Sequence, residues 1–214
     1  MEGKVAIAIP TGALLDGARD LLERTHLASL GEAEMGRQLL IDGDEVRVIL
    51  VRPADVPAYV DHGAADLGIV GKDILWETPG AHYELVDLRF GGCRLVLAVP
   101  NGSSLDGPQT WPPTLRVATK YPRTATAWFE ALGQAVEVVR LHGSVELAPQ
   151  VGLVDGIVDL TASGRTLREN GLRVAAELGS STARLIANQA SLKTRTAAVQ
   201  SVVARLREAS NRAG

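Results

Sequence analysis

The sequence predicts an α/β fold, in which short strands alternate with helices that cover a sheet. Runs rich in β-branched residues recur along the chain, and between them apolar residues return at the three- and four-residue spacing of an amphipathic helix. The chain has 214 residues, of which 46% are hydrophobic. This is more than one minimal core needs, so one long domain or two small lobes would both fit.

Strands are expected where β-branched and other apolar residues form short runs. The first run ends at Pro10, is too short for a signal peptide and has no cleavage site of small residues, so it is interpreted as a strand. In chain order the expected strands are residues 5–9, 46–51, 66–70, 94–99, 115–118, 136–140 and 156–160.

Helices are expected between and after these strands. A helix should begin at Pro53 and run to about residue 61, because the N–H that proline lacks is not used in the first turn. Two more are marked by apolar residues at helical spacing, which are Leu14, Leu15, Ala18, Leu21 and Leu22, then Ala125, Trp128, Phe129 and Leu132. A last helix, at residues 196–209, should pack on a lobe through Ala198, Val202, Leu206 and Ala209.

Two segments are candidates for a division of the chain. The loop at residues 100–113 concentrates Gly, Ser, Asp and prolines around Trp111, and is the expected break. The preceding Phe90-Gly91-Gly92 is the better candidate for a hinge, because paired glycines let the backbone turn freely.

Composition excludes several classes of function. The net charge is −3 with both signs intermixed, so no broad positive field is expected and nucleic acid is not an expected partner. No run of about 18 apolar residues occurs, so no membrane span is expected. The single cysteine, Cys93, cannot form an intramolecular disulfide, which fits a reducing compartment, and a cytoplasmic protein is expected.

Several reactive or aromatic side chains have a structural interpretation. Cys93, at an expected strand start, is interpreted as a small buried hydrophobe. Trp128 and Phe129 lie on the apolar face of an expected helix and are interpreted as core residues. A zinc site is not expected, because the four histidines lack metal-ligand spacing; they are His26, His62, His82 and His142.

The segment richest in chemistry is residues 143–167. The strand expected near residue 160 leads directly into a turn of small polar residues that starts a helix, and such a turn leaves backbone N–H groups free to bind a phosphate. Ser163 and Thr166 add hydroxyls and Arg165 adds charge, while Asp155 and Asp159 could hold sugar hydroxyls or a magnesium ion. The same residues are also common as plain helix caps, so both interpretations stay open on this evidence.

Five blocks of this chain, in the same order, resemble the ATP phosphoribosyltransferase family over most of its length. Four blocks precede residue 143. They are Arg52-Pro-Ala-Asp-Val-Pro-Ala-Tyr-Val, Gly63-Ala-Ala-Asp-Leu-Gly-Ile-Val-Gly-Lys-Asp, Asp87-Leu with Gly92-Cys-Arg-Leu, and Val117-Ala-Thr-Lys-Tyr-Pro. The last comprises Gly143-Ser-Val-Glu-Leu-Ala-Pro, Gly152-Leu through Asp159-Leu, Ser163-Gly164, Thr166-Leu167 and Asn170-Gly171-Leu172.

The resemblance implies an α/β protein of two lobes, like a type II periplasmic binding protein, with a cleft between them. The first lobe would comprise residues 1–90 plus 180–214, and the second, residues 91–179, would carry the phosphoribosyl pyrophosphate loop. The chain lacks the further regulatory domain of the family's long form. It therefore resembles the short-form catalytic subunit, which forms homodimer units within a hetero-oligomer that includes a regulatory subunit similar to histidyl-tRNA synthetase.

The implied reaction condenses ATP with phosphoribosyl pyrophosphate to N1-(5-phosphoribosyl)-ATP and pyrophosphate, the first step of histidine biosynthesis. Magnesium, Mg²⁺, would act with the substrate phosphates and without direct protein ligation. By resemblance, the catalytic residues are Arg37, Glu146 and Asp159. The residues for phosphoribosyl pyrophosphate are Asp159, Ala162, Ser163, Gly164, Arg165, Thr166 and Leu167; those for ATP are Thr11, Gly12, Gly71, Lys72, Lys120 and Tyr121, with Arg123 a further candidate for the nucleotide phosphates.

One departure from the family pattern bears on activity. Where the family has Pro-Lys-Gly-Arg after the first strand, this chain has Pro10-Thr11-Gly12-Ala13, so two cations are missing. A catalytically weakened or silent copy is therefore one alternative. The other is a solute-binding module, because the same fold serves receptors.

Overall fold

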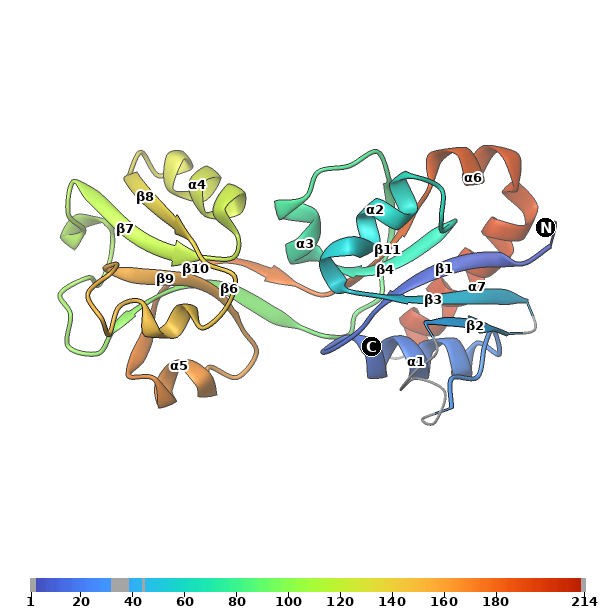
Figure 1. The fold of residues 1–214 in the computed structure, drawn as a ribbon, viewed down its shortest axis with the longest axis horizontal. Helices are drawn as coiled ribbons and strands as arrows, with labels where there is room; N and C mark the ends of the chain where they lie inside the picture. The colour runs from blue at the N-terminus through green and yellow to red at the C-terminus, as the bar shows by residue number, and fades with distance from the viewer. Residues whose placement is uncertain (1–2, 32–38, 44, 213–214) are drawn as a thin grey trace. The chain divides into compact units, whose positions relative to one another are not determined.

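The computed structural model describes residues 3–31, 39–43 and 45–212. The chain divides into two compact units, which we describe separately (Figure 1). The first unit comprises Met1–Gly91 and Thr182–Gly214, and the second comprises Gly92–Ser181. The boundaries implied by the resemblance lie one or two residues away from these. The second unit is thus an insertion in the first, and the chain passes between the units twice.

The described part of the first unit is built on a six-stranded sheet with the order β2-β3-β1-β4-β11-β5. The central strands β3, β1 and β4 are parallel, whereas β2, β11 and β5 pair with their neighbours in antiparallel fashion. The strands are β1 Val5–Pro10, β2 Leu40–Asp42, β3 Val46–Val51, β4 Leu67–Gly71, β5 Tyr83–Asp87 and β11 Ala183–Ala187. The helices are α1 Leu15–Arg24, η1 Pro53–Asp55, α2 Val56–Asp61, α3 Lys72–Glu77, α6 Gln189–Thr194 and α7 Thr196–Arg212.

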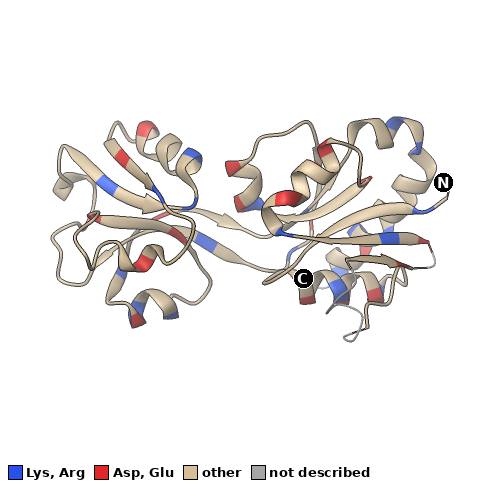
Figure 2. Ribbon diagram, viewed as in Figure 1, with Lys and Arg blue, Asp and Glu red and all other residues tan. Residues whose placement is uncertain are grey.

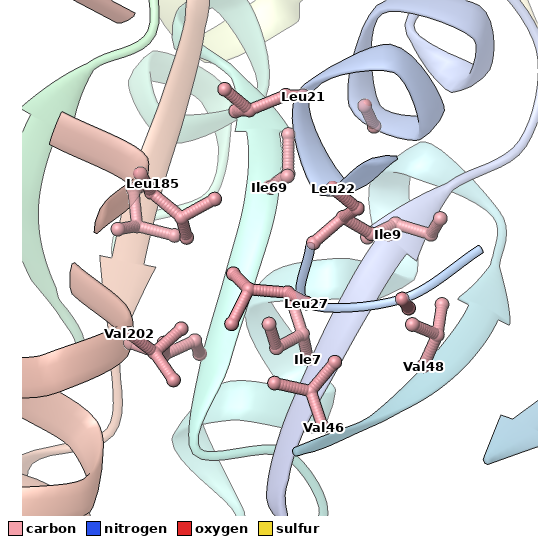
Figure 3. Packing of buried hydrophobic residues seen from close by; sticks show 14 of the residues in the cluster. Ile7, Ile9, Leu21, Leu22, Leu27, Val46, Val48, Ile69, Leu185 and Val202 are labelled. Carbon is pink, nitrogen blue, oxygen red and sulfur yellow. The ribbon is translucent and has the colours of Figure 1, made fainter. Parts of the chain in front are cut away.

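Successive side chains of β1 enter two different cores, because residues of a strand point alternately to the two faces of a sheet. Ile7 and Ile9 pack with Leu21 and Leu22 of α1 and with Val202 of α7 (Figure 3). The residue between them, Ala8, belongs to a separate cluster with the apolar face of α2. Burial on both faces explains why this strand is a continuous apolar run in the sequence.

The second unit, all of whose residues are described, has a five-stranded sheet with the order β10-β6-β9-β7-β8. β8, β7 and β9 are parallel, and β6 and β10 are antiparallel. The strands are β6 Cys93–Pro100, β7 Thr114–Thr119, β8 Ala135–Arg140, β9 Gly156–Thr161 and β10 Leu172–Ser181. The helices are η2 Pro108–Thr110, α4 Pro122–Ala131, η3 Val145–Leu147 and α5 Arg165–Glu169.

Aromatic side chains fill the space beside α4 in the second unit. Phe129 is fully buried, and its ring meets those of Trp111 and Trp128 edge-on at centroid distances of 5.7 and 4.9 Å. Trp128 is half-buried. The core interpretation of these two helix residues is therefore right for Phe129 and partly right for Trp128.

A buried carboxylate fastens the returning end of the chain to the first unit. Asp66 accepts hydrogen bonds from the Ala6 amide at 2.8 Å and from the guanidinium of Arg195, which lies between α6 and α7. The same guanidinium donates to the Lys4 carbonyl at 2.8 Å. The pair therefore holds the start of β1 to the base of the C-terminal helix.

All seven expected strands are present, with ends within one residue of those predicted. Four strands were not predicted: β2, β5, β10 and β11. They lack long β-branched runs, and in β10 a register shift interrupts the pairing pattern. The expected break at residues 100–113 is wrong, because this loop lies inside the second unit, while the unit boundary falls at Gly91 and Gly92.

Two smaller expectations also need correction. In α7, Val202 and Leu206 are buried and Ala209 packs against the core as expected, but Ala198 is exposed and the neighbouring Val199 is buried in its place. Cys93 does begin a strand, but it is half-buried and not enclosed in the core. Among the described residues, no helix combines the length and the apolar character that a bilayer crossing requires.

Substitution Asp66→Ala is expected to lower the free energy of unfolding by about 2–4 kcal/mol, because it leaves a partly buried arginine and a backbone amide without their acceptor. Chemical denaturation measures the loss. The matched control is Glu208→Ala, which removes an exposed ion pair with Arg212 on α7 and should change stability little. Equal effects of the two substitutions would contradict the role given to Asp66.

Candidate active site

The carboxyl ends of three parallel strands gather the chemistry-bearing residues of the second unit at one edge of its sheet. β9 leads into the turn before α5, β7 leads to Lys120 and Tyr121 before α4, and β8 leads to the loop before η3, which carries Glu146. In open α/β sheets this edge is where ligands bind. Topology therefore brings together three segments that are far apart in the sequence.

A hydroxyl fixes the shape of the turn after β9. The side chain of Thr161, the last residue of β9, accepts a hydrogen bond from the Gly164 amide at 2.8 Å. Gly164 has a φ of 71°, in the left-handed region that favours glycine, and a Cβ there would lie 3.1 Å from Arg168 Nη1. On the far side, Arg168 Nη1 donates to the Ser163 carbonyl at 3.0 Å.

The first amides of α5 are left available by this arrangement. Among the described residues, no acceptor lies within hydrogen-bond distance of the Thr166 or Leu167 amides, and the Arg165 amide has only a long contact of 3.4 Å to Ser163 Oγ. Ala162, Ser163 and Thr166 are exposed around them. The turn can therefore present backbone donors and hydroxyls to an anion.

The guanidinium of Arg165, which was expected to add positive charge for a phosphate, is paired with a carboxylate of the same helix. Its guanidinium Nε lies 2.7 Å from Glu169 Oε1, one helical turn further on. Arg168, which sequence reasoning did not single out, is the arginine that contacts the turn itself. Thr161 was also missed, although a threonine placed directly before a Ser-Gly turn is a detectable signal for such a hydroxyl bond.

Asp159 lies beside two other candidates from the sequence. β7 and β9 pair through Thr119 and Val158, so the next residues along, Lys120 and Asp159, come at neighbouring positions. Burial raises the pKa of the Asp159 carboxyl above its ordinary value of 3.8, and the negative charge of Glu146 raises it further. The hydrogen bond from the Leu160 amide and the positive charge of Lys120 oppose the increase.

Not every acidic residue near the turn is available to a ligand. Asp155 accepts the Arg116 amide at 2.8 Å and meets the Arg116 guanidinium at 3.1 Å, while its own amide donates to the Arg116 carbonyl. It thus connects the amino ends of β7 and β9, which is the opposite edge of the sheet. This pairing and position do not support the hypothesis that Asp155 holds sugar hydroxyls or magnesium.

The turn after β7 is shaped by a second threonine. Thr119 donates from Oγ1 to the Val158 carbonyl at 2.6 Å and accepts the Tyr121 amide at 2.9 Å. Tyr121 is buried, whereas Lys120 is exposed. Lys120 is therefore the member of this pair that can reach a solvated phosphate.

The first unit holds the remaining candidates. Thr11 and Gly12 follow β1, where the Thr11 amide donates to the Val51 carbonyl at 2.9 Å and Gly12 has a φ of 82°. Gly71 ends β4 and Lys72 begins α3, with Lys72 Nζ 2.5 Å from Glu84 Oε2. Arg37 lies outside the described residues.

Acidic and basic residues are interspersed along the elements of each unit (Figure 2). Within the described residues, no group of three or more His, Cys, Asp or Glu side chains is arranged to hold a metal ion.

This chain is similar to one known family over most of its length. The model of the family described as ATP phosphoribosyltransferase matches residues 52–208. An ATP phosphoribosyltransferase of Rubrobacter xylanophilus is 50% identical over 200 residues, covering 92% of this chain and 93% of its own. One from Caldanaerobacter subterraneus is 44% identical over 209 residues, covering 97% and 98%.

Solved structures give a consistent result. A chain of the ATP phosphoribosyl transferase (HisG:HisZ) complex from Thermotoga maritima superimposes with a TM-score of 0.82 at 33% identity, covering 97% of this chain and 99% of that one. The periplasmic aliphatic sulphonate binding protein SsuA from Escherichia coli gives a TM-score of 0.62 at 18% identity, covering 98% and 73%. The latter likeness shows only the fold, which is the type II periplasmic-binding-protein fold that was expected.

Substitution Asp159→Asn is expected to stabilise the protein near neutral pH. Because the folded-state pKa is raised, the folded state binds more protons than the unfolded state at pH values between the two pKa values, and stability falls as pH rises through this window. Above the window the full penalty of a buried charge remains, and asparagine removes it. Thermal unfolding from pH 3 to pH 8 should therefore show an advantage of the variant that grows above the ordinary pKa of 3.8. An advantage independent of pH would contradict this explanation.

Proposed function

This chain belongs to the ATP phosphoribosyltransferase family, and we propose that it binds the 5′-phosphate of phosphoribosyl pyrophosphate at the turn between β9 and α5. The family assignment makes it a pentosyltransferase of the first step of histidine biosynthesis, similar to short-form catalytic subunits. The proposal concerns which residues bind which part of each substrate.

One observation carries the phosphate assignment: the amides of Thr166 and Leu167 have no acceptor among the described residues. Backbone amides at the start of a helix bind phosphate well, because the helix dipole adds favourable potential. The exposed side chains of Ser163 and Thr166 supply hydroxyl donors beside them. The Thr161 and Arg168 contacts keep the turn in this shape before a ligand arrives, so little ordering is needed on binding.

In the reaction, adenine N1 of ATP attacks C1 of the ribose, and the bond from C1 to the pyrophosphate oxygen breaks. N1 already has a lone pair, so no strong base is needed. Positive charge develops on the sugar and negative charge on the leaving pyrophosphate, so positioning and electrostatic stabilisation supply most of the catalysis. We assign Asp159 to the ribose hydroxyls and Glu146 to the neighbourhood of the reacting carbon. Their negative charges suit a cationic transition state.

A magnesium ion bound to the diphosphate would neutralise part of its charge. The residues present fit such an ion, because Asp159 and Glu146 offer hard oxygen atoms of the type that magnesium prefers. The described residues provide no larger cluster. We therefore propose that the ion is held mainly by substrate oxygens.

ATP is assigned to residues in both units. Lys120 is exposed and suited to a phosphate, while Tyr121 and Gly71 shape the backbone next to Lys120 and Lys72. Thr11 and Gly12 follow β1 on the first unit. We keep Arg37 as a candidate catalytic residue: it would reach into the active site of a neighbouring subunit and stabilise the leaving pyrophosphate.

A regulatory partner is part of the proposal. The superimposed Thermotoga maritima chain comes from a HisG:HisZ complex, and it matches this chain over almost the full length of both. We propose that this chain likewise assembles into a hetero-oligomer, with homodimer units and a regulatory subunit similar to histidyl-tRNA synthetase. We propose a cytoplasmic location, which fits a biosynthetic role of this kind.

Substitution Thr166→Leu is expected to weaken binding of phosphoribosyl pyrophosphate by tenfold or more, because it removes a hydroxyl donor and crowds the two open amides; about 1.4 kcal/mol corresponds to tenfold. Isothermal titration in the presence of magnesium measures the dissociation constant. Thr114→Leu is the matched control, since Thr114 is exposed at the amino end of β7, on the opposite edge of the same sheet. Unchanged binding by the Thr166 variant would remove the phosphate assignment.

The missing cations after β1 give a second test. Ala13 is exposed, so an arginine fits there, and the double substitution Thr11→Lys and Ala13→Arg restores the family pattern. We expect kcat/KM to rise, because each charge-assisted contact to a phosphate is worth about 1.5–3 kcal/mol when formed. The assay mixes the chain with ATP, phosphoribosyl pyrophosphate and magnesium, removes pyrophosphate and follows the altered adenine absorbance.

The same assay, together with isothermal titration of small metabolites, separates the alternatives. A weakened copy gains activity from the two cations, whereas a silent structural subunit stays inactive with or without a regulatory subunit. A solute-binding module, which the SsuA-like fold also allows, would bind a small metabolite without turnover.

A further inference from the structure

Four charged side chains form a continuous chain of contacts at one end of the sheet in the first unit. Lys72, the first residue of α3, lies 2.5 Å from Glu84 Oε2 of β5. The other oxygen, Glu84 Oε1, lies 3.7 Å from Arg184 Nε of β11, and Arg184 Nη1 lies 2.8 Å from Asp87 Oδ2. The order of contacts is therefore lysine, glutamate, arginine, aspartate.

One donor in this series of four charged side chains lacks a hydrogen bond. Arg184 Nε is buried and, among the described residues, has no hydrogen-bond acceptor. A separation of 3.7 Å from Glu84 is too long for a hydrogen bond. A buried N–H without an acceptor is unfavourable, so a small shift of the Glu84 carboxylate toward Arg184 would be stabilising. The contact with Lys72 holds the carboxylate on the other side.

Lys72 has the complementary problem. For its ammonium to bind a nucleotide phosphate, it must leave Glu84, which would then keep only the long 3.7 Å contact with Arg184. Arg184 Nε is the donor that can take its place. Closure of Glu84 onto Arg184 would give the arginine nitrogen its acceptor and would offset part, but not all, of the cost of releasing Lys72.

We propose that Glu84 sets the affinity for ATP by exchanging partners: it pairs with Lys72 in the free enzyme and closes onto Arg184 when Lys72 turns to the nucleotide phosphates. This inference rests on the proposed function, in which Lys72 contacts ATP. Glu84 acts through Lys72 and touches no substrate, so it is a positioning residue.

Asp87, the last member of the series of contacts, is held in place by residues near the points where the polypeptide passes between the units. Asp87 accepts hydrogen bonds from the Thr182 hydroxyl at 2.8 Å and the Arg89 amide at 2.9 Å. Thr182 is the first residue of the returning segment of the first unit, and Arg89 lies two residues before Gly91, where the first segment ends. Although burial acts to raise the pKa of Asp87, these hydrogen bonds and the charges of Arg184 and Arg89 lower it. The carboxylate therefore stays ionised and keeps Arg184 oriented toward Glu84 during the exchange.

A double-mutant cycle tests the exchange. The variants are Glu84→Gln, Lys72→Met and the two combined, and ATP binding in the presence of magnesium is measured by isothermal titration. Glutamine keeps the shape of the side chain but releases the ammonium, so we expect E84Q to bind ATP about threefold to tenfold more tightly than the wild type. In the K72M background the same change should alter ATP affinity by less than about twofold, because the competing pair no longer exists.

Controls separate this effect from a general change of charge. Glu45→Gln removes the same charge from another ion pair of the first unit, with Arg205 at 2.7 Å, and should leave ATP affinity unchanged. Steady-state kinetics add a second measurement: E84Q should lower the KM for ATP and leave the KM for phosphoribosyl pyrophosphate unchanged. Thermal midpoints of all variants establish that they are folded.

The outcomes distinguish this inference from the proposed function. If K72M binds ATP like the wild type, the assignment of Lys72 to the nucleotide is wrong and the exchange falls with it. If K72M binds more weakly but E84Q is unchanged or also weaker, the nucleotide assignment survives and the exchange is overturned. An equal gain from E84Q with and without Lys72 would show a long-range charge effect and would also overturn it.

Discussion

The hydrogen bond from the Gly164 amide to the Thr161 hydroxyl is the contact on which the candidate site depends. It closes a tight turn directly after β9 and holds Gly164 in the left-handed conformation that few other residues adopt. The chain can then enter α5 with the Thr166 and Leu167 amides free of hydrogen bonds to the described residues. Arg168 closes the turn from the other side through the Ser163 carbonyl, so the free amides are the product of a rigid local structure.

Around this turn the protein keeps charges that do not favour folding. Asp159 is half-buried, and the charge of Glu146 opposes its ionisation, while only Lys120 and one backbone amide compensate. An arrangement optimised for stability alone would not place a second carboxylate where it opposes ionisation of the first. Such departures from the most stable choice are common at functional sites, because a charge held ready for a substrate cannot also be neutralised by the protein.

The two units use different electrostatic arrangements. In the second unit, donors are left open and the nearby arginine, Arg165, is neutralised within its own helix by Glu169. In the first unit, Lys72 is paired with Glu84, so a ligand that takes the lysine must displace a carboxylate. The backbone amides of the second unit are thus available to a ligand before it binds. Lys72 of the first unit becomes available only when it leaves Glu84.

The amino-acid sequence alone determined the class of fold, seven strands, the family and the segment of residues 143–167 that carries the turn. These features depend on local patterns: β-branched runs, helical spacing and a strand followed by small polar residues. Only the tertiary structure decided which of the nearby charges remain available. Asp155 is consumed by Arg116 from another strand, Arg165 is paired with Glu169, and Lys72 meets Glu84 across twelve residues. A side chain's partner depends on strand order and register, which bring distant residues within a few ångströms, and no local pattern in the sequence specifies that distance.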